Sequence, residues 1–199
     1  MNDTRQHILF TAFKLFIKEG YRDITMSRLV NESGLSKGAF YHYFVSKEQL
    51  FSETVNTFFF GMFEKINISP DDQLSLRENL LRIIDGKDQA FKTFADYSGG
   101  EVPEVNFFMY LFQAIQYLPD MKEKMKTYLE YESQIFVRMI SYAKMRGEIK
   151  QSVDENAFAR QISCMMDGVE LHGVMLSDYA SIFVTERQMI HFLCDLVEI

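Results

Sequence analysis

The sequence predicts an all-α protein in which a small N-terminal three-helix domain precedes a larger helical domain, with about nine or ten helices in all. Apolar residues recur every three to four positions along most of the 199 residues. Glycine and proline stand at the ends of these periodic segments, and there is no sustained alternating pattern of the kind that predicts strands. A composition of 47% hydrophobic and 25% charged residues is typical of a globular protein with a substantial core.

The N-terminal domain is predicted to begin with three helices that have clear start and stop signals. The first covers about residues 3–19 and ends at Gly20, where a left-handed backbone is easily adopted. The second covers about 26–32, and the third about 37–43. We expect the side chains that cap the second and third helices to be Thr25 and Ser36, and we expect Gly34 to end the second.

A fourth helix is predicted to begin at Ser46, because Ser46-Lys47-Glu48-Gln49 has the pattern of a capping box. Its continuation through Phe58–Phe63 is apolar on nearly every side, so this half should be buried. A further helix should start at Ser69-Pro70-Asp71-Asp72, with proline in its first turn. Asp85-Gly86 and Ser98-Gly99-Gly100 are expected to separate the helices that follow.

The C-terminal part is predicted to contain four more helices. One opens at Pro103 and ends before Pro119, and a long one covers about 120–146. Ser152 and Glu155 have capping-box spacing, which predicts a helix over about 154–177. Thr185 is the expected cap of a last helix over about 186–198.

Charge is distributed unevenly along the chain. The net charge is −7, but residues 1–47 carry seven lysines and arginines against four acids, whereas the remainder carries 14 against 24. A basic head on an acidic body suits a protein that touches phosphates with one end only. No run of about 18 apolar residues predicts a membrane span, and the N-terminus does not have the pattern of a signal peptide, so we expect a cytoplasmic protein without a membrane partner.

No pattern of catalytic or metal-binding residues stands out. Cys164 and Cys194 are not in a Cys-x-x-Cys pair, and we expect two buried free thiols. The four histidines are scattered, and neither a glycine-rich phosphate loop nor a nucleophile elbow is found. We therefore expect no metal, no cofactor and no enzymatic activity.

Two short helices joined through Gly34-Leu35-Ser36 have the size of a helix-turn-helix, which we place at about residues 25–44. Gly38 inside the second of them costs about 1 kcal/mol relative to alanine, which favours a role that needs close approach of DNA. Lys37, Tyr41 and His42 lie on the side away from Phe40 and Phe44 and can offer donors to phosphates and bases. The alternative is an aromatic corner packed for structure alone.

The stretch from Arg5 to Leu50 resembles the DNA-binding domain of the tetracycline-repressor (TetR) family. The residues that carry the resemblance are Ala12, Phe16, Gly20-Tyr21, Thr25, Gly34-Leu35-Ser36, Gly38, Tyr41, Phe44, Ser46-Lys47-Glu48 and Leu50. It implies that Ser36, Lys37, Gly38, Tyr41, His42 and Lys47 face DNA, and that Thr25 and Ser27 contact phosphate. A phosphate at the start of the fourth helix would also explain Lys47 at that positive helix end. Leu29-Val30 departs from the family pattern, and there is almost no basic arm before Arg5.

The resemblance further implies a homodimer that pairs the helices at about 120–146 and 154–177 with their twins around a two-fold axis. This would separate two recognition helices by about 34 Å and would require a palindromic operator. The alternative is that these apolar faces form the core of a single chain. The candidate interface residues are Tyr128, Phe136, Met139, Phe158, Ile162, Met165, Val169, Gly173 and Leu176.

The larger domain is expected to sense a small molecule, with the division at 1–47 for DNA binding and 48–199 for ligand sensing and dimerisation. Its wealth of Phe, Tyr and Met favours a hydrophobic or aromatic effector, although the same residues could fill a solid core. The candidate lining residues are Phe59, Met62, Phe63, Phe94, Tyr97, Phe108, Phe112, Gln113, Gln116, Met166 and Glu170. Ligand binding would re-space the DNA-binding heads and release the operator. Two alternatives are a DNA binder controlled by a protein partner and a helical protein-interaction module.

Overall fold

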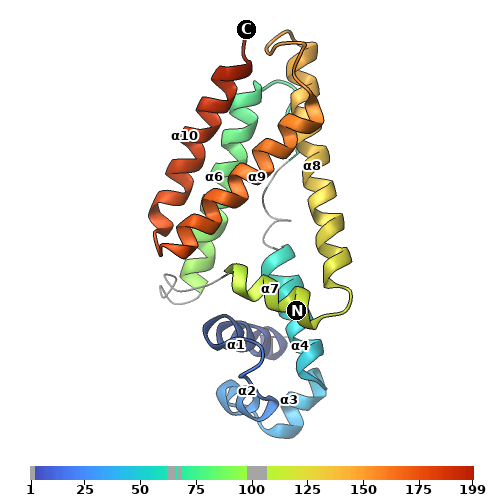
Figure 1. Cartoon of the computed structure of the whole chain (residues 1–199). Coiled ribbons are helices and arrows are strands. Elements are labelled where there is room, and N and C mark those ends of the chain that lie inside the picture. Colours follow the sequence, from blue (N-terminus) through green and yellow to red (C-terminus); the bar gives the residue numbers. More distant parts are fainter. Residues whose placement is uncertain (1–2, 62–65, 67–68, 98–106) are drawn as a thin grey trace. The chain divides into compact units, whose positions relative to one another are not determined.

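The computed structural model describes residues 3–61, 66, 69–97 and 107–199, with the side chains of 93–97 and 107 not described, and these residues form an all-α fold, as predicted (Figure 1). Within them, the one pairing of extended backbone is an isolated antiparallel bridge between Ile149 and Glu198. The chain divides into two compact units, Met1–Lys65 with Tyr97–Glu123 and Ile66–Asp96 with Lys124–Ile199. The helices at 47–60 and 107–117, which the sequence placed with the sensing domain, therefore belong to the same unit as the N-terminal helices.

The first unit contains the three predicted N-terminal helices, and their observed ends agree closely with the prediction. They are followed by a helix whose second half is a π-helix, and by one helix from later in the chain. The helices are α1 (Asp3–Glu19), α2 (Met26–Ser33), α3 (Lys37–Tyr43), α4 (Lys47–Thr54), the π-helix η1 (Val55–Phe60) and α7 (Phe107–Tyr117).

The predicted caps explain why these short helices begin where they do. Thr25 accepts a hydrogen bond from the Arg28 N–H, and Ser36 accepts one from the Ala39 N–H. Ser46 accepts one from the Gln49 N–H in the same way. Each cap satisfies a backbone donor that has no partner within its helix, which stabilises the helix by about 1 kcal/mol.

Aromatic side chains form the core of the first unit. Phe13, Phe16 and Phe51 are all at most 2% exposed, and the Phe51 ring lies 5.0 Å from that of Phe16 in an edge-on contact. Tyr110 brings α7 into this core, with its ring 5.4 Å from Phe13 and 5.3 Å from Phe51. Burial of one such side chain contributes about 1.5–3 kcal/mol, so α7 is an integral part of this unit.

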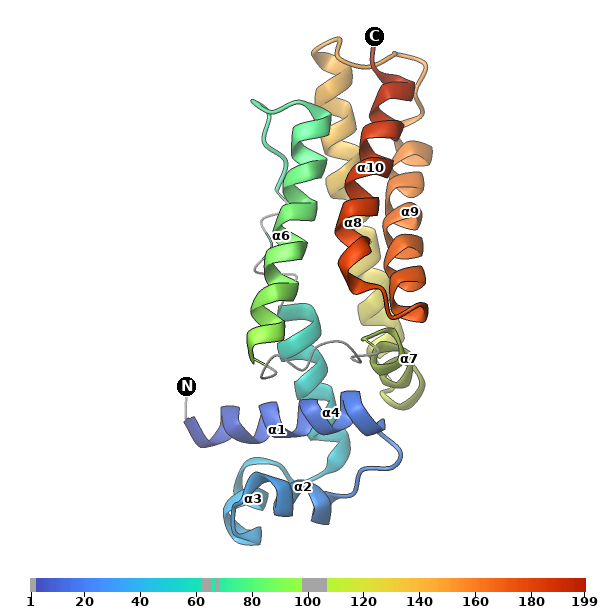
Figure 2. The same cartoon turned by 90° about the vertical axis from the view of Figure 1, so that its left-hand side faces the viewer.

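The second unit consists of long helices that run side by side, α6 (Leu76–Tyr97), most of α8 (Met121–Met145), α9 (Glu155–Met175) and α10 (Tyr179–Val197) (Figure 2). All four contribute to one buried apolar cluster, which includes Leu80, Ile84, Phe136, Ile140, Phe158, Ile162 and Ile190. Close packing between α9 and α10 depends on Gly173, because a Cβ there would lie 2.3 Å from Cγ1 of Ile182. None of the helices within the described ranges combines the length and apolarity of a membrane span.

The predicted helix start at Ser69–Asp72 is wrong, because α6 begins at Leu76. The Asp71 side chain accepts a hydrogen bond from the Gln73 N–H at 2.9 Å, which closes a local turn instead. Ser75 and Glu78 then form the capping box, with each side chain accepting from the other's backbone N–H. The helix also continues through Asp85-Gly86, which the sequence analysis expected to be a break.

Two further helix starts differ from the prediction. Asp154, and not Ser152, caps α9, because the Asp154 side chain accepts a hydrogen bond from the Ala157 N–H at 2.8 Å. The last helix begins at Tyr179, seven residues before the predicted position, so Thr185 lies inside it. Buried Ile182 extends the apolar face of α10 toward its N-terminus, and packing has overridden the local capping signal.

Candidate nucleic-acid interface

The third helix has one buried face and one open face. Phe40 and Phe44 are 1% and 0% exposed and anchor α3 to the first unit. Ser36, Lys37, Gly38 and His42 are exposed, and Tyr41 is partly exposed. The predicted donors thus lie on the outer surface, where a groove could receive them, and their contact with DNA stays a prediction.

The turn between α2 and α3 is fixed from three sides. Gly34 adopts the left-handed conformation with φ of 68°, which glycine adopts at little energetic cost. The Ser33 hydroxyl donates to the Val30 carbonyl at 2.7 Å, and the ring Nε2 of His7 donates to the Ser33 carbonyl at 2.9 Å. The contact from α1 through His7 was not predicted, because nothing in the local sequence signals a partner 26 residues away.

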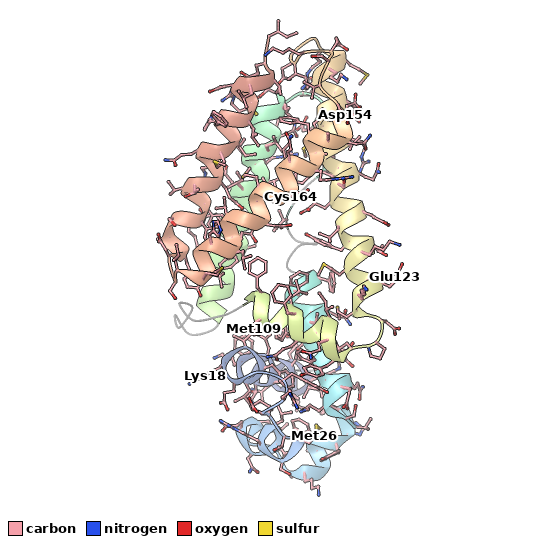
Figure 3. All side chains as sticks on the ribbon, viewed as in Figure 1. Lys18, Met26, Met109, Glu123, Asp154 and Cys164 are labelled. Atoms are coloured by element: carbon pink, nitrogen blue, oxygen red, sulfur yellow. The ribbon has the colours of Figure 1, made fainter. Side chains whose placement is uncertain are left out.

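Two more of the predicted contacts lie at the start of α2. Thr25 and Ser27 are exposed, and Thr25 already caps the helix through Arg28 (Figure 3 labels Met26, which lies between them). Arg28 pairs with Glu19 through both of its terminal nitrogens, with NH2 2.7 Å from the Glu19 carboxylate. Glu19 thereby neutralises the charge of Arg28 beside the predicted phosphate contacts. Thr25 and Ser27 can therefore contribute hydroxyl groups, without a free positive charge from Arg28.

Lys47 has a structural role that the sequence analysis did not predict. Its Nζ donates to the Tyr21 and Ile24 carbonyls, each at 2.9 Å, and lies 4.2 Å from the centroid of the Tyr21 ring. The ammonium group thereby ties the connection between α1 and α2 to the start of α4. An ammonium has three donors, so the predicted phosphate contact would use the third.

Tyr21 is the centre of a small polar network beneath this surface. Its hydroxyl donates to the Glu48 carboxylate at 3.1 Å. Burial, followed by the charge of Glu48, raises the pKa of Tyr21 to about 12. The Glu48 pKa is lowered, first by a hydrogen bond from its own backbone and then by the bond from Tyr21. The phenol therefore stays protonated, and the carboxylate stays ionised, throughout the neutral range.

Helix α7 is hydrogen-bonded to the residues that join α1 to α2. The side-chain oxygen of Gln113 accepts from the Tyr21 N–H at 2.6 Å, and its nitrogen lies 2.9 Å from where a Cβ on Gly20 would be. The Tyr110 hydroxyl donates to the Thr54 hydroxyl at 2.8 Å within the core. Gln113 was predicted to hold a ligand, and the structure places its side chain on the DNA-binding unit.

The other predicted ligand residues fall into several environments. Phe59 is buried, Phe108 is partly exposed, and Phe112 and Gln116 are exposed. In the second unit, Met166 is buried in the apolar cluster and Glu170 pairs with Lys87. Met62 and Phe63 lie outside the described residues, as do the side chains of Phe94 and Tyr97, so a common pocket stays a prediction.

Most of the predicted interface residues are buried within the single chain. Phe136, Met139, Phe158, Ile162 and Gly173 are buried in the second unit, as the single-chain alternative expects. Tyr128, Met165 and Val169 are partly exposed, and Leu176 is 77% exposed. The sequence analysis missed a different apolar stripe on α10, where Val184, Phe192 and Leu196 are each more than half exposed. Spacings of eight and four residues place them on one helix face, a signal that a pattern search of this segment could have found.

Comparison with known proteins bears directly on the first unit. Residues 8–54 match the family described as "Bacterial regulatory proteins, tetR family". The chain is 44% identical over 50 residues to the uncharacterized regulator YerO of Bacillus subtilis, covering 25% of this chain and 17% of that protein. It is 43% identical over 47 residues to the transcriptional repressor NemR of Escherichia coli K12, covering 24% of each. The matches thus span less than a quarter of these relatives.

The fold of the whole chain is similar to that of solved regulators. A putative transcriptional regulator from Saccharomonospora viridis, solved in complex with choline, superimposes with a TM-score of 0.69 and covers 100% of both chains. The two are 17% identical, a level at which the likeness shows the fold alone. The sequence matches lie in the N-terminal helices of the first unit. The similarity of fold extends over the whole chain.

Proposed function

We propose that the chain, whose residues 8–54 match the tetR family of bacterial regulatory proteins, is a homodimeric repressor that releases a palindromic operator when a small molecule binds its second unit. The observation that carries the proposal is the open face of α3. Its lysine, glycine and histidine are exposed, whereas Phe40 and Phe44 fasten the opposite face to the core. This orientation suits a helix that enters a major groove.

The contacts that hold both ends of α3 favour a rigid DNA-binding unit, which we call the reading head. Helix α3 begins at the Ser36 cap and is preceded by the Gly34 turn, which His7 fastens to α1. At its other end, the Arg5 guanidinium lies 5.2 Å from the centroid of the buried Phe44 ring and pairs with Glu53. A head held in this way offers its donors in one geometry, which reduces the entropy lost on binding.

A second copy of the chain is the partner that the exposed stripe on α10 fits best. Val184, Phe192 and Leu196 are between 54% and 58% exposed, and Met189 adds to the same surface at 39%. Monomeric proteins seldom leave such a contiguous apolar patch open to water. A two-fold pairing of this face would supply the two reading heads that a palindromic site requires. The proposed interface is therefore on α10, together with the adjoining exposed Met175 and Leu176 at the end of α9.

Helix α7 gives a route by which an effector could act on the head. It is bonded to Tyr21 and Thr54 within the DNA-binding unit, and only three residues separate it from α8 along the chain. A ligand that prefers one position of α8 would therefore bias the position of α7 and, through Tyr21, the heads. The relative that was solved with choline supports the view that proteins of this fold hold small molecules, and NemR by its name is a repressor.

The DNA-binding part is tested by gel-shift titration with genomic fragments at about 50 and 200 mM salt. We expect binding whose affinity falls steeply with salt, because phosphate contacts release counterions. Binding that ignores salt, or no binding at all, would favour a protein-interaction module.

The dimer is tested by sedimentation of Phe192→Glu beside Met145→Glu, since both positions are exposed and apolar but Met145 lies on α8. We expect only Phe192→Glu to give monomers, because a charge would be buried in the proposed interface. A wild-type monomer would refute the pairing.

A further inference from the structure

Inside the second unit, four acidic side chains from three helices gather around Lys87, which lies on a fourth helix. Lys87 of α6 pairs with Glu170 of α9 and, at 3.1 Å, with Glu186 of α10. Glu132 of α8 and Asp167 of α9 interact electrostatically with the same lysine. The side chains of Lys87 and Glu170 are only 15% and 22% exposed, so these charges are largely withdrawn from water. A single positive charge thus faces four carboxyl groups.

The two carboxylate oxygens of Glu186 differ in their hydrogen bonding. Its side chain is 0% exposed, and one carboxylate oxygen, Oε1, accepts from Lys87. The other oxygen, Oε2, is buried and accepts no hydrogen bond from the residues that the structure describes. A buried acceptor without a donor destabilises the structure, so a positively charged ligand would gain most by binding at this atom.

Two of these acids, Glu132 and Glu186, have raised pKa values. Burial raises the pKa of Glu186 to about 7, and the neighbouring Glu170 adds to the effect. Burial, together with Asp167, likewise raises the pKa of Glu132 to about 7. Tyr128 of α8 lies in the field of the same acids, and its pKa is raised by burial and by Glu132. Protonation of Glu132 and Glu186 therefore reduces the excess negative charge around Lys87.

We propose that Glu132, Asp167, Glu170 and Glu186 form a binding site for an organic ammonium group, with the phenol ring of Tyr128 as a face on which the cation can rest. Glu186 supplies the innermost carboxylate, and Asp167, which is exposed, forms the outer end of the site. Aromatic faces attract such cations through the negative charge on the face of the ring. The inference rests on the proposed function, since it names the chemical class of the effector as a cation with an apolar body.

The same charges argue against an anionic effector. Lys87 is the one basic group among the six titratable side chains of the cluster, and two carboxylates already engage it. A carboxylate or phosphate ligand would have to displace one of them and leave it buried without a counterion. An ammonium group instead would replace the protons that Glu132 and Glu186 hold below about pH 7.

The test compares two probes of the same shape in the intact protein without DNA, phenyltrimethylammonium and its neutral isostere tert-butylbenzene. Binding is followed by chemical-shift titration between about pH 6 and 8. We expect the cation to bind at least tenfold more tightly than the isostere. Its affinity should rise with pH through about 7, because the cation favours the ionised forms of Glu132 and Glu186.

Two variants and one control locate the site. Glu186→Gln should weaken the cation at least tenfold and leave the isostere unchanged, whereas Glu130→Gln, on the exposed side of α8, should change neither. Lys87→Met should strengthen the cation, because it removes the competing charge; it provides a second test if Glu186→Gln fails to fold. Equal affinity for the two probes, or wild-type cation affinity in Glu186→Gln, would overturn the inference.

A parallel gel shift separates this inference from the proposed function. Loss of operator binding on addition of the cation supports both. Cation binding that leaves operator affinity unchanged supports the site and refutes its role as the effector site. Operator binding by a protein that has no preference for the cation refutes the site and leaves the DNA-binding proposal standing.

Discussion

The two compact units place charge in opposite ways. In the first unit, Lys37 and His42 lie on the surface, and the buried hydroxyls of Tyr110 and Thr54 in the aromatic core are hydrogen-bonded. In the second unit, Lys87 and Glu186 lie among the helices, and one carboxylate oxygen of Glu186 accepts no hydrogen bond within the described part of the chain. A core whose buried polar groups are all hydrogen-bonded is rigid, whereas a buried polar group without a partner can be stabilised by a ligand. On the proposed function, we therefore expect the first unit to be the more rigid and the second unit to respond to a ligand.

The largest effect is expected at the aromatic core of the first unit. Phe51→Ala should lower the free energy of unfolding by about 3–5 kcal/mol, because it leaves a cavity among Phe16, Tyr21 and Tyr110. Urea unfolding followed by circular dichroism measures the change. A loss below about 1 kcal/mol would contradict the view that this core fixes the head.

A smaller effect is expected at Lys47, where structure and DNA binding both depend on one ammonium group. Lys47→Ala should lower the free energy of unfolding by about 1–2 kcal/mol, because the Tyr21 and Ile24 carbonyls lose their donor. It should also reduce the salt slope of DNA binding by about one. Unchanged stability with a reduced slope would mean that Lys47 serves phosphate alone.

The link between α7 and the head should be worth still less in stability. Gln113→Ala removes the acceptor of the Tyr21 N–H and should cost about 1 kcal/mol in a urea titration. The variant should also affect regulation. Its affinity for the operator should be unchanged, whereas the ligand should release it from the operator less effectively. Lys122→Ala, at an exposed position near the start of α8, is the control and should behave as wild type.

The smallest expected effect distinguishes the second unit by its response to pH. Because the pKa values of Glu132 and Glu186 are raised to about 7 in the folded chain, from an ordinary 4.5, folding holds their protons more tightly. Their ionisation therefore destabilises the fold as pH rises from about 4.5 to 7, and the effect levels off above that. We expect the Tm to fall by a few degrees between pH 5 and 8.

Two glutamine variants test whether these acids cause the trend. Glu132→Gln should flatten the fall in Tm, because it removes one of the two raised carboxyl groups. Glu130→Gln should leave it unchanged, since Glu130 is exposed on the same helix. A Tm that rises over this range in the wild-type protein would show that the buried acids are not the dominant groups.

The difference between the units also explains what the sequence could predict. Thr25, Ser36 and Ser46 cap helices through neighbours three residues away, so the bounds of α2, α3 and α4 follow from local patterns. The outward face of α3 follows from the spacing of Phe40 and Phe44. Where two local signals competed, the prediction was wrong, as at Pro70, because the turn at Asp71 and the box at Ser75 are equally local.

Contacts between distant parts of the chain could not be predicted in this way. Tyr21 and Gln113 are 92 residues apart, and Lys87 and Glu186 are 99 apart. A single sequence does not reveal that such positions meet, because neither residue has neighbours in the sequence that indicate a distant partner. Glu170 was singled out as a ligand residue, but its lysine partner and Glu186 were missed, since only the assembled bundle shows that these charges are buried together.

The central claim, that the exposed face of α3 contacts DNA, is tested most directly by the operator affinity of Lys37→Ala at several salt concentrations, beside Lys122→Ala. Both lysines are exposed, and Lys122 lies near the start of α8. We predict that Lys37→Ala weakens binding and lowers the salt slope by about one, whereas Lys122→Ala binds as wild type. Wild-type affinity and slope in Lys37→Ala would contradict the account.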